Sequence, residues 1–252
     1  MKAHLKEVEK ALARHPQRVS THNPEAYIGG GQSKLRYLGL KTPNLHATQK
    51  AGFSFSSKED SREVARVWNY IWHNSDCFEV MSLALGWFEL LAKNKKRKHE
   101  LKEHWPLLSA WCERIDNWAH SDSLSGLYAR ILEQDPRLVY PTLQKWNSSK
   151  NPWLRRLSIV SLLYYSAQRE RVLPFKKIVA LVEPQVDFEH YYVQKGVGWT
   201  LRESGNVYPE ETYAFLEKNI TRISAHAFSA ATEKLTKPKK DRLKKLRARD
   251  LL

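Results

Sequence analysis

The chain has 252 residues, with 42 lysines and arginines against 27 aspartates and glutamates, so its formal charge at neutral pH is +15. This surplus favours a polyanionic partner, nucleic acid first, and argues against a neutral molecule as the only ligand. A solvated basic surface and a polybasic membrane-surface protein are the alternatives. No apolar run reaches the ~18 residues of a membrane-spanning helix. Because Met1-Lys-Ala-His also lacks an apolar signal core, we expect an intracellular, cytoplasmic protein without a membrane partner.

Hydrophobic residues recur at helical intervals along most of the chain, and no segment has the pattern of a strand or hairpin. Thr42-Pro43 and Asn151-Pro152 each place an N-cap residue before a proline at the first helical position. Ser57 and Asp60 have the spacing of a capping box, ahead of an amphipathic run that breaks at Asn74. Further helices are expected at about 4–14, 77–93, 106–116, 123–133, 137–146, 191–204, 209–219 and 222–235, with a charged helix after Pro238.

Many short helices with short Pro-, Asn-, Ser- or Gly-containing connections are typical of antiparallel helix pairs stacked in sequence. The sequence has no clean period, but degenerate repeats of this kind retain helix packing rather than residue identity. We therefore predict an all-α fold, a HEAT-like solenoid of stacked antiparallel helix pairs with a concave basic groove. The prediction has one domain over residues 1–252, with a charged C-terminal segment at about 237–252. A compact irregular helical bundle is the structural alternative.

The basic residues are concentrated in some segments. Lys93–Lys98 and Lys237–Arg249 are as consistent with a solubilising surface as with a phosphate-binding one. Arg155-Arg156, Lys195 and Arg202 differ, because each belongs to an apolar helix that also carries an aromatic residue. A cation in such a setting usually lies at the edge of a groove.

Motifs for other chemistries are missing from the sequence. Gly29–Gly31 lacks the Lys-Ser/Thr of a P-loop, the ten histidines form no HExxH motif, and no GxSxG nucleophile motif occurs. Cys77 and Cys112 have neither the spacing of a zinc site nor that of a disulfide framework, so we expect them to be core residues. We expect neither a metal ion nor another cofactor.

Trp118 and Asp122 are four residues apart, so within one helix they share a face. The alternative for Asp122 is an N-cap of a helix that begins at Ser123 and continues to Leu132. Most of the nine tryptophans are expected to be packing residues. Trp118 and Trp199 differ from the other tryptophans, because each has ionisable neighbours in a basic helical protein.

These segments resemble motifs of the AlkD-like family of DNA alkylation repair glycosylases. Lys195-Gly-Val-Gly-Trp-Thr-Leu-Arg-Glu203 matches the family's KxxGWxLRE helix, which supplies a lesion-side tryptophan, here Trp199. The family's W-x-x-x-D segment, which supplies a tryptophan and the catalytic aspartate, matches Trp118 and Asp122. The first of these two matches is the more specific.

The resemblance extends further along the chain. It runs from about Tyr37-Leu-Gly-Leu-Lys-Thr-Pro43, similar to the family's FLG(I/V)-x-x-P segment, to about Leu235. A WLxR-type helix of the family matches Arg156. One departure is that members often have an acid directly after the first tryptophan, where this chain has Ala119 followed by His120. The departure leaves open a divergent or weakened enzyme.

The resemblance implies a metal-free, monofunctional DNA glycosylase. Such an enzyme hydrolyses the N-glycosyl bonds that join 3-methyladenine and 7-methylguanine to deoxyribose. Alkylation at N3 or N7 of a purine makes the base cationic and weakens its glycosidic bond, so the main remaining task is to stabilise an oxocarbenium-like sugar. Asp122 is then the stabilising anion, and Trp118 and Trp199 cradle the cation. In this family the base is not extruded into a tight pocket.

The implied partner is double-stranded DNA that contains alkylated bases, bound by a monomer without an obligate protein partner. The residues expected to bind DNA are Arg156, Arg155, Lys195, Arg202 and Tyr27. Phosphate contacts from such residues give affinity rather than base-sequence readout. Two alternatives remain: a non-catalytic protein that binds damaged or structured DNA, and a helical protein-interaction scaffold, which leaves the pairing of tryptophan with aspartate unexplained.

Overall fold

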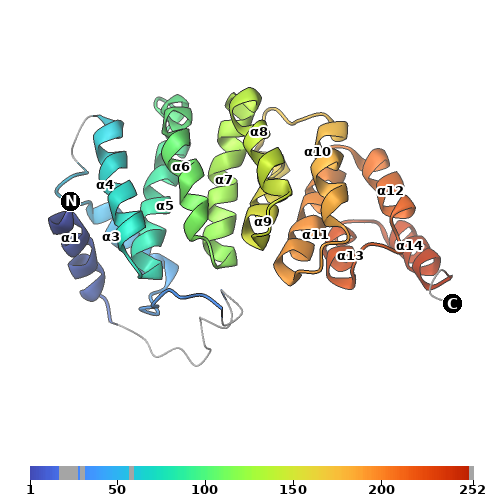
Figure 1. The fold of residues 1–252 in the computed structure, drawn as a ribbon, viewed down its shortest axis with the longest axis horizontal. Helices are drawn as coiled ribbons and strands as arrows, with labels where there is room; N and C mark the ends of the chain where they lie inside the picture. Colours follow the sequence, from blue (N-terminus) through green and yellow to red (C-terminus); the bar gives the residue numbers. More distant parts are fainter. Residues whose placement is uncertain (17–27, 29–31, 57–59, 250–252) are drawn as a thin grey trace. The chain divides into compact units, whose positions relative to one another are not determined.

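The structure is a computed structural model that describes residues 1–16, 28, 32–56 and 60–249. Within these ranges the regular elements are helices, and the β contact present is an isolated bridge between Arg36 and Cys77. Figure 1 shows these helices in chain order. The all-α prediction is confirmed.

The first of two compact units comprises Met1–Leu127. Its helices are α1 (Lys2–Ala13), α3 (Thr42–Ala51), α4 (Ser61–Asn74), α5 (Phe78–Lys93), η1 (Lys98–His104), α6 (Trp105–Trp111), η2 (Cys112–Arg114) and the first part of α7 (Trp118–Gln134). α4 packs on α5, its neighbour in the chain. α3, the helix before α4, also packs on α5. The core of this unit combines aliphatic and aromatic side chains, and the indole rings of Trp72 and Trp111 stack with centroids 4.4 Å apart.

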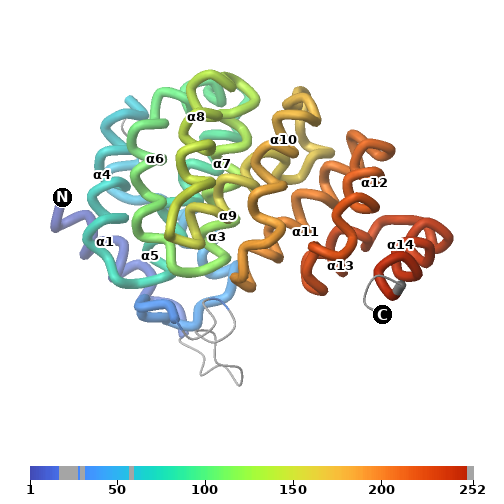
Figure 2. Tube along the Cα trace, turned by 45° about the vertical axis from the view of Figure 1, so that its right-hand side comes forward, coloured from blue at the N-terminus to red at the C-terminus, as the bar shows by residue number. Residues whose placement is uncertain are grey.

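The second unit comprises Tyr128–Leu252. After the last part of α7 it contains α8 (Pro136–Asn147), α9 (Pro152–Val160), η3 (Ser166–Gln168), α10 (Phe175–Val182), η4 (Glu183–Gln185), α11 (Tyr191–Gly205), α12 (Pro209–Lys218), α13 (Ala225–Ala231) and α14 (Lys237–Arg249). Figure 2 shows α9, α11 and α13 in succession, and α11 packs against both of the others. α8 and α12 pack on α9 and α11 respectively. α11 thus contacts its chain neighbour α12 and the next helix but one on either side, as in stacked helix pairs.

Polar side chains start several of these helices. Asn151 accepts a hydrogen bond from the N–H of Trp153 at 2.9 Å, as expected for an N-cap before Pro152. The prediction that Thr42 is the N-cap before Pro43 is wrong, because Thr42 is already helical. Lys41 precedes α3 and makes no side-chain cap. The capping-box spacing predicts Ser57 as the N-cap, but the N-cap of α4 is Asp60. Ser57 lies outside the described residues.

Other helix bounds differ from the prediction. α13 and α6 are shorter than expected, at Ala225–Ala231 and Trp105–Trp111. α10 was not predicted, because its eight residues between two prolines are too few to display a helical period. The basic segment 93–98 joins the last residue of α5 to the first of η1.

A buried carboxylate explains the backbone conformation of the segment Tyr37–Pro43. Glu79, at the start of α5, accepts hydrogen bonds from the N–H groups of Leu38 at 3.0 Å and Leu40 at 3.2 Å. Gly39, between them, has a φ of 71°, in the region that glycine adopts without strain. The two N–H groups converge on one carboxylate because the glycine turns the backbone between them.

Both cysteines are buried core residues, as expected. Burial disfavours the thiolate and raises the pKa of Cys77 to about 11 and that of Cys112 to about 12. None of the described helices combines the length and apolar character that crossing a bilayer requires.

Candidate functional site

The first turns of α7 carry Trp118 and Asp122. α7 begins at Trp118, and the side chain of Asn117 accepts a hydrogen bond from the N–H of His120 at 2.9 Å, which caps the helix. Asp122 therefore lies inside α7, and the alternative in which it caps a helix starting at Ser123 is wrong. Trp118 and Asp122 are both half-buried and one turn apart, so they share a face of α7.

A buried histidine fixes this start of α7 to α5. The His120 ring stacks on that of Phe78 with centroids 4.3 Å apart and an interplanar angle of 9°. Its Nε2 lies 3.0 Å from Ser82 Oγ and 3.2 Å from the Phe78 carbonyl oxygen, and its Nδ1 lies 3.2 Å from Asn117 Nδ2. These contacts suit one neutral tautomer, in which Nε2–H donates and Nδ1 accepts. His120, directly after Ala119, thus anchors the turn that contains Trp118 and Asp122 to α5.

Acid is expected to destabilise the protein through His120. Burial disfavours the imidazolium and lowers the pKa of His120 from 6.5 to about 4. The unfolded chain therefore binds a proton between these pH values that the folded chain does not, so the free energy of unfolding decreases as pH falls through this window. The full contribution is about 3 kcal/mol, and chemical denaturation at a series of pH values measures it.

His120→Gln is the matched variant for this experiment, because it keeps a polar side chain without a titrating ring. The variant should lose less stability than the wild-type protein between pH 7 and pH 4. Burial also lowers the pKa of His104, which leaves a smaller dependence of the same sign. Identical pH dependences for variant and wild type would contradict the burial of a neutral His120.

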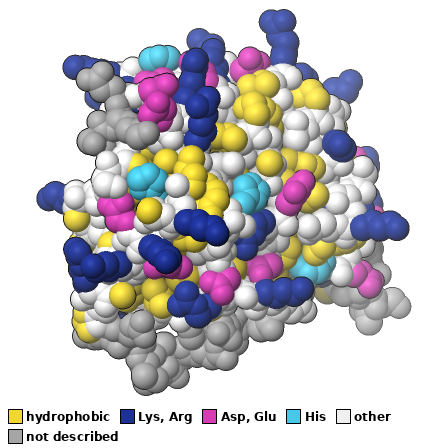
Figure 3. All heavy atoms as spheres, turned by 60° about the vertical axis from the view of Figure 1, so that its left-hand side comes forward, with side chains coloured by type: hydrophobic (Ala, Val, Ile, Leu, Met, Phe, Trp, Pro, Cys, Tyr) yellow, Lys and Arg dark blue, Asp and Glu magenta, His cyan; other side chains and the backbone are white. Residues whose placement is uncertain are grey.

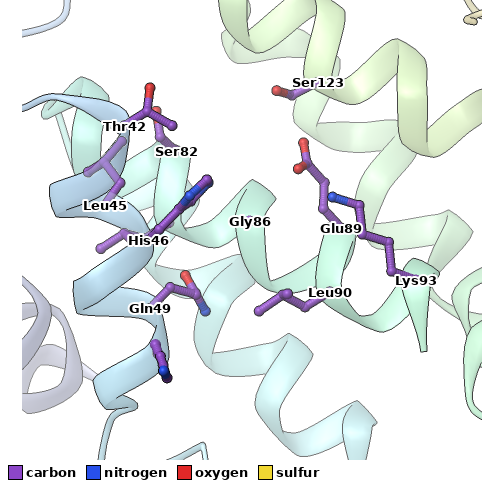
Figure 4. A pocket seen from close by; sticks show the side chains of 12 residues that line it. Thr42, Leu45, His46, Gln49, Ser82, Gly86, Glu89, Leu90, Lys93 and Ser123 are labelled. Carbon is purple, nitrogen blue, oxygen red and sulfur yellow. The ribbon is translucent and has the colours of Figure 1, made fainter.

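A cavity of about 510 Å³ lies in the first unit, lined by α3, α5 and the first turns of α7. Figure 4 shows His46 and Gln49 on α3, Glu89 and Lys93 beside each other on α5, and Ser123 on α7. Ser123 directly follows Asp122 in the chain. No sequence motif indicated this cavity, because its lining comes from three separate helices.

In the second unit, Trp199 of α11 lies in a cluster of aromatic rings. The Tyr164 ring is nearly parallel to it, with centroids 5.7 Å apart and an interplanar angle of 11°. The Tyr165 ring meets it edge-on at 5.3 Å, and the Arg202 guanidinium lies over it at 4.6 Å from the ring centroid. We call Tyr164, Tyr165, Trp199 and Arg202 the Trp199 cluster. The cation site on the Trp199 ring is thus occupied by the protein's own arginine.

Two expected DNA-binding cations lie on α11 with Trp199. Arg202 Nη1 is 2.8 Å from Glu233 Oε2, and this contact lowers the pKa of Glu233. Lys195, one turn before Trp199, is exposed. Lys195 is the more available of the two for a phosphate, because Arg202 already binds a carboxylate and a ring.

Arg155 and Arg156 of α9 make internal contacts. Arg155 Nη1 donates to Gln185 Oε1 at 3.0 Å, and its guanidinium lies 4.1 Å from the Phe188 ring centroid. Arg156 is 4% exposed, and its Nη1 donates to the Tyr192 carbonyl oxygen at 2.6 Å. A phosphate contact from Arg156 requires its buried side chain to move. Tyr27 lies outside the described residues.

The two glycines before Trp199 allow α11 to approach its neighbours closely. A Cβ atom on Gly196 would lie 3.3 Å from side-chain atoms of α9. A Cβ atom on Gly198 would lie 2.6 Å from the Ala227 carbonyl oxygen and 2.7 Å from the Ala230 Cβ in α13. Real Cβ atoms do not approach backbone so closely, so Gly198 of the KxxGWxLRE helix is a packing requirement.

Sequence reasoning missed the last residue of that motif as a site residue. Glu203 is buried, and its Oε2 accepts hydrogen bonds from the Ser166 N–H at 2.9 Å and the Ser166 hydroxyl at 2.8 Å. Ser166 follows Tyr165, which belongs to the Trp199 cluster. The available signal was the glutamate at the end of the apolar motif, because a carboxylate at such a position requires polar partners when it is buried.

Basic side chains are distributed over the surface rather than gathered in one patch on the face that Figure 3 shows, where acidic, histidine and apolar side chains lie among them. Several of the described cations have acidic partners, such as Arg62 with Glu103 at 2.9 Å and Lys239 with Glu210 at 3.0 Å. Exposed pairs of this kind contribute little to stability. The concave basic groove stays a prediction.

Comparison with known proteins identifies the family. Residues 2–235 match the family described as DNA alkylation repair enzyme. A solved structure described as a predicted DNA alkylation repair enzyme from Enterococcus faecalis is 15% identical with a TM-score of 0.64, over 85% of this chain and 93% of that chain, and this supports the helical fold.

A second solved structure, described as AlkD2 from Streptococcus mutans, is 16% identical with a TM-score of 0.49, over 96% of this chain and 97% of that chain. At that TM-score the likeness carries no argument. A search of curated proteins found no match. The family match spans both compact units and all the motifs from which the resemblance was inferred, so the chain belongs to the DNA alkylation repair enzyme family.

Proposed function

We propose that the protein is a monofunctional DNA glycosylase that excises N3- and N7-alkylated purines, such as 3-methyladenine and 7-methylguanine, from duplex DNA inside the cell. The observation that carries the proposal is the start of α7, which His120 anchors to α5. There the half-buried Trp118 and Asp122 share one helix face, next to the anchor at His120. Fixed charges and rings are what a cationic transition state needs, because they do not have to reorganise during the reaction.

The proposed reaction breaks the bond between C1′ of the deoxyribose and the purine nitrogen. The bond's electron pair passes to the cationic base, which leaves as a neutral purine, while positive charge develops on the sugar. Asp122 stabilises this charge, and Trp118 and Trp199 contribute electron-rich ring faces. Water adds at C1′ and releases a proton to solvent.

The occupied cation site on Trp199 is consistent with this role. Arg202 lies 4.6 Å from the Trp199 ring centroid, so the ring already stabilises one positive charge. In the proposed mechanism, Arg202 turns from the ring toward a phosphate when DNA binds, and the developing sugar cation takes its place. Lys195, on the same helix, provides a further phosphate contact.

Release of free base from duplex DNA that contains 7-methylguanine, measured with enzyme in excess over DNA, tests the proposal. A single-exponential release well above the spontaneous rate supports the glycosylase. Duplex binding without base release would instead support a non-catalytic DNA-binding protein. The absence of both would favour a protein-interaction scaffold.

Binding of duplex DNA is expected to weaken steeply as salt increases. Each neutralised phosphate contributes about −0.9 to the slope of log affinity against log salt concentration. Lys195→Gln should therefore reduce the slope by about one. The control is Lys145→Gln, an exposed lysine on α8, a helix without proposed site residues. Fluorescence anisotropy at several salt concentrations measures both, and equal slopes for Lys195→Gln and wild type would remove Lys195 from the interface.

A further inference from the structure

Tyr165 has an unusual backbone conformation. Its φ of 48° and ψ of 73° lie in the left-handed region, and no other non-glycine residue among those described has a positive φ. A side chain with a Cβ atom is strained there, whereas glycine and asparagine adopt the region readily. A bulky aromatic residue keeps such a conformation only where its surroundings determine it, which is common at functional sites.

A buried carboxylate determines the conformation. Glu203 is 2% exposed, and its Oε2 receives two hydrogen bonds from Ser166, the residue after Tyr165. Asn206 Nδ2 also donates to Ser166 Oγ at 3.0 Å. These contacts hold the turn from its C-terminal side, and the Gln168 N–H donates to the Tyr165 carbonyl oxygen at 2.8 Å.

The other oxygen of Glu203 faces cations. Glu203 Oε1 lies 3.4 Å from Arg202 Nε and 3.7 Å from Lys234 Nζ. One carboxylate therefore holds both the turn that carries Tyr165 and the arginine that covers Trp199. The position of Tyr165 in the Trp199 cluster therefore depends on this residue.

Tyr165 is exposed at the surface of the Trp199 cluster. The residue is 43% exposed, although its ring contacts those of Trp199 at 5.3 Å and Tyr164 at 4.8 Å. A tyrosine that served only to fill the core would be buried, and a turn that served only as a connection would have glycine or asparagine at this φ. Tyr165 lies beside Trp199, and Trp199 belongs to α11, the helix that also carries the exposed Lys195. Exposed aromatic rings next to a cation are typical of surfaces that stack on nucleotides.

We infer that Tyr165 is a DNA-contacting residue whose ring extends the Trp199 surface against the sugar of the damaged nucleotide, and that Glu203 is the positioning residue that presents it. This inference rests on the proposed glycosylase function. It assigns the last residue of the KxxGWxLRE helix a role in the site.

Tyr165→Gly separates this role from a structural one, because it removes the ring and relieves the backbone strain together. We expect the melting temperature to be equal to that of the wild type or a few degrees higher, and release of 7-methylguanine to fall about tenfold or more. Tyr165→Phe, which keeps the ring, should restore most of the base release that Tyr165→Gly loses. Tyr191→Ala, which truncates another exposed tyrosine of the same unit, 51% exposed as a residue, should stay within about twofold of the wild type.

Glu203→Gln tests the positioning role. It should lower base release in the wild-type background and have little further effect in Tyr165→Gly, since coupled residues are non-additive. Equal effects in both backgrounds would assign Glu203 to stability alone. A folded Tyr165→Gly variant with wild-type base release and duplex affinity would overturn the inference. If the wild-type protein itself releases no base, the proposed function fails, and the comparison of duplex affinities alone then decides whether Tyr165 contacts DNA.

Discussion

Asp122→Asn is expected to lower the release of 7-methylguanine from duplex DNA by about 10²–10³-fold, because loss of a preorganised charge at a transition state commonly has an effect of this size. Duplex affinity should change little, since the substitution keeps the shape of the side chain and phosphate contacts dominate affinity. Single-turnover base release and fluorescence anisotropy measure the two quantities on the same preparation.

The matched control for Asp122→Asn is Glu89→Gln, which neutralises a half-buried carboxylate of α5 in the same unit. This variant should retain base release within about threefold of the wild type if the effect is specific to Asp122. Thermal unfolding of both variants shows whether either is destabilised. Full activity of a folded Asp122→Asn variant would remove the carboxylate from the proposed mechanism.

Gly198→Ala is expected to destabilise the protein by about 1–3 kcal/mol, because the added methyl group would overlap the Ala227 carbonyl oxygen and the Ala230 side chain. The helix propensity of alanine acts in the opposite direction by up to about 1 kcal/mol. The steric term should win because one of the clashing groups is backbone. Chemical denaturation measures the net change.

Gly205→Ala, the last residue of the same helix, provides the comparison. A Cβ atom there would meet Thr212 Cγ2 at 3.9 Å, an ordinary contact. We expect this variant to be neutral or slightly more stable than the wild type. If Gly198→Ala behaved in the same way, the close approach of α11 and α13 would not be a packing requirement.

Hydrophobic periodicity was sufficient to predict most helices, because apolar residues of one helix face recur every three or four positions. It failed at the start of α7, where the buried residues include His120, Ser121 and Ser125. Polar residues in the core interrupt the apolar pattern, so the helix was expected to begin at Ser123. The N-cap Asn117, directly before Trp118, was the local signal for the true start.

The predicted site residues were chosen from motifs, and their contacts depend on segments that are distant in sequence. Arg156 donates to a carbonyl oxygen 36 residues away, and Arg202 binds Glu233, 31 residues away. No pattern around either arginine reports these partners. The structure therefore shows which cations have internal partners before DNA arrives, which composition alone does not indicate.

The burial of the two cysteines has a consequence for a protein whose family is named for alkylation damage. Electrophiles that methylate DNA bases also react with thiolates, the nucleophilic form of cysteine. With pKa values of about 11 and about 12, Cys77 and Cys112 are almost entirely protonated at neutral pH, and both lie within the core. The protein therefore offers such reagents no readily accessible thiolate, and its cysteines are protected from the agents whose damage its family is named for repairing.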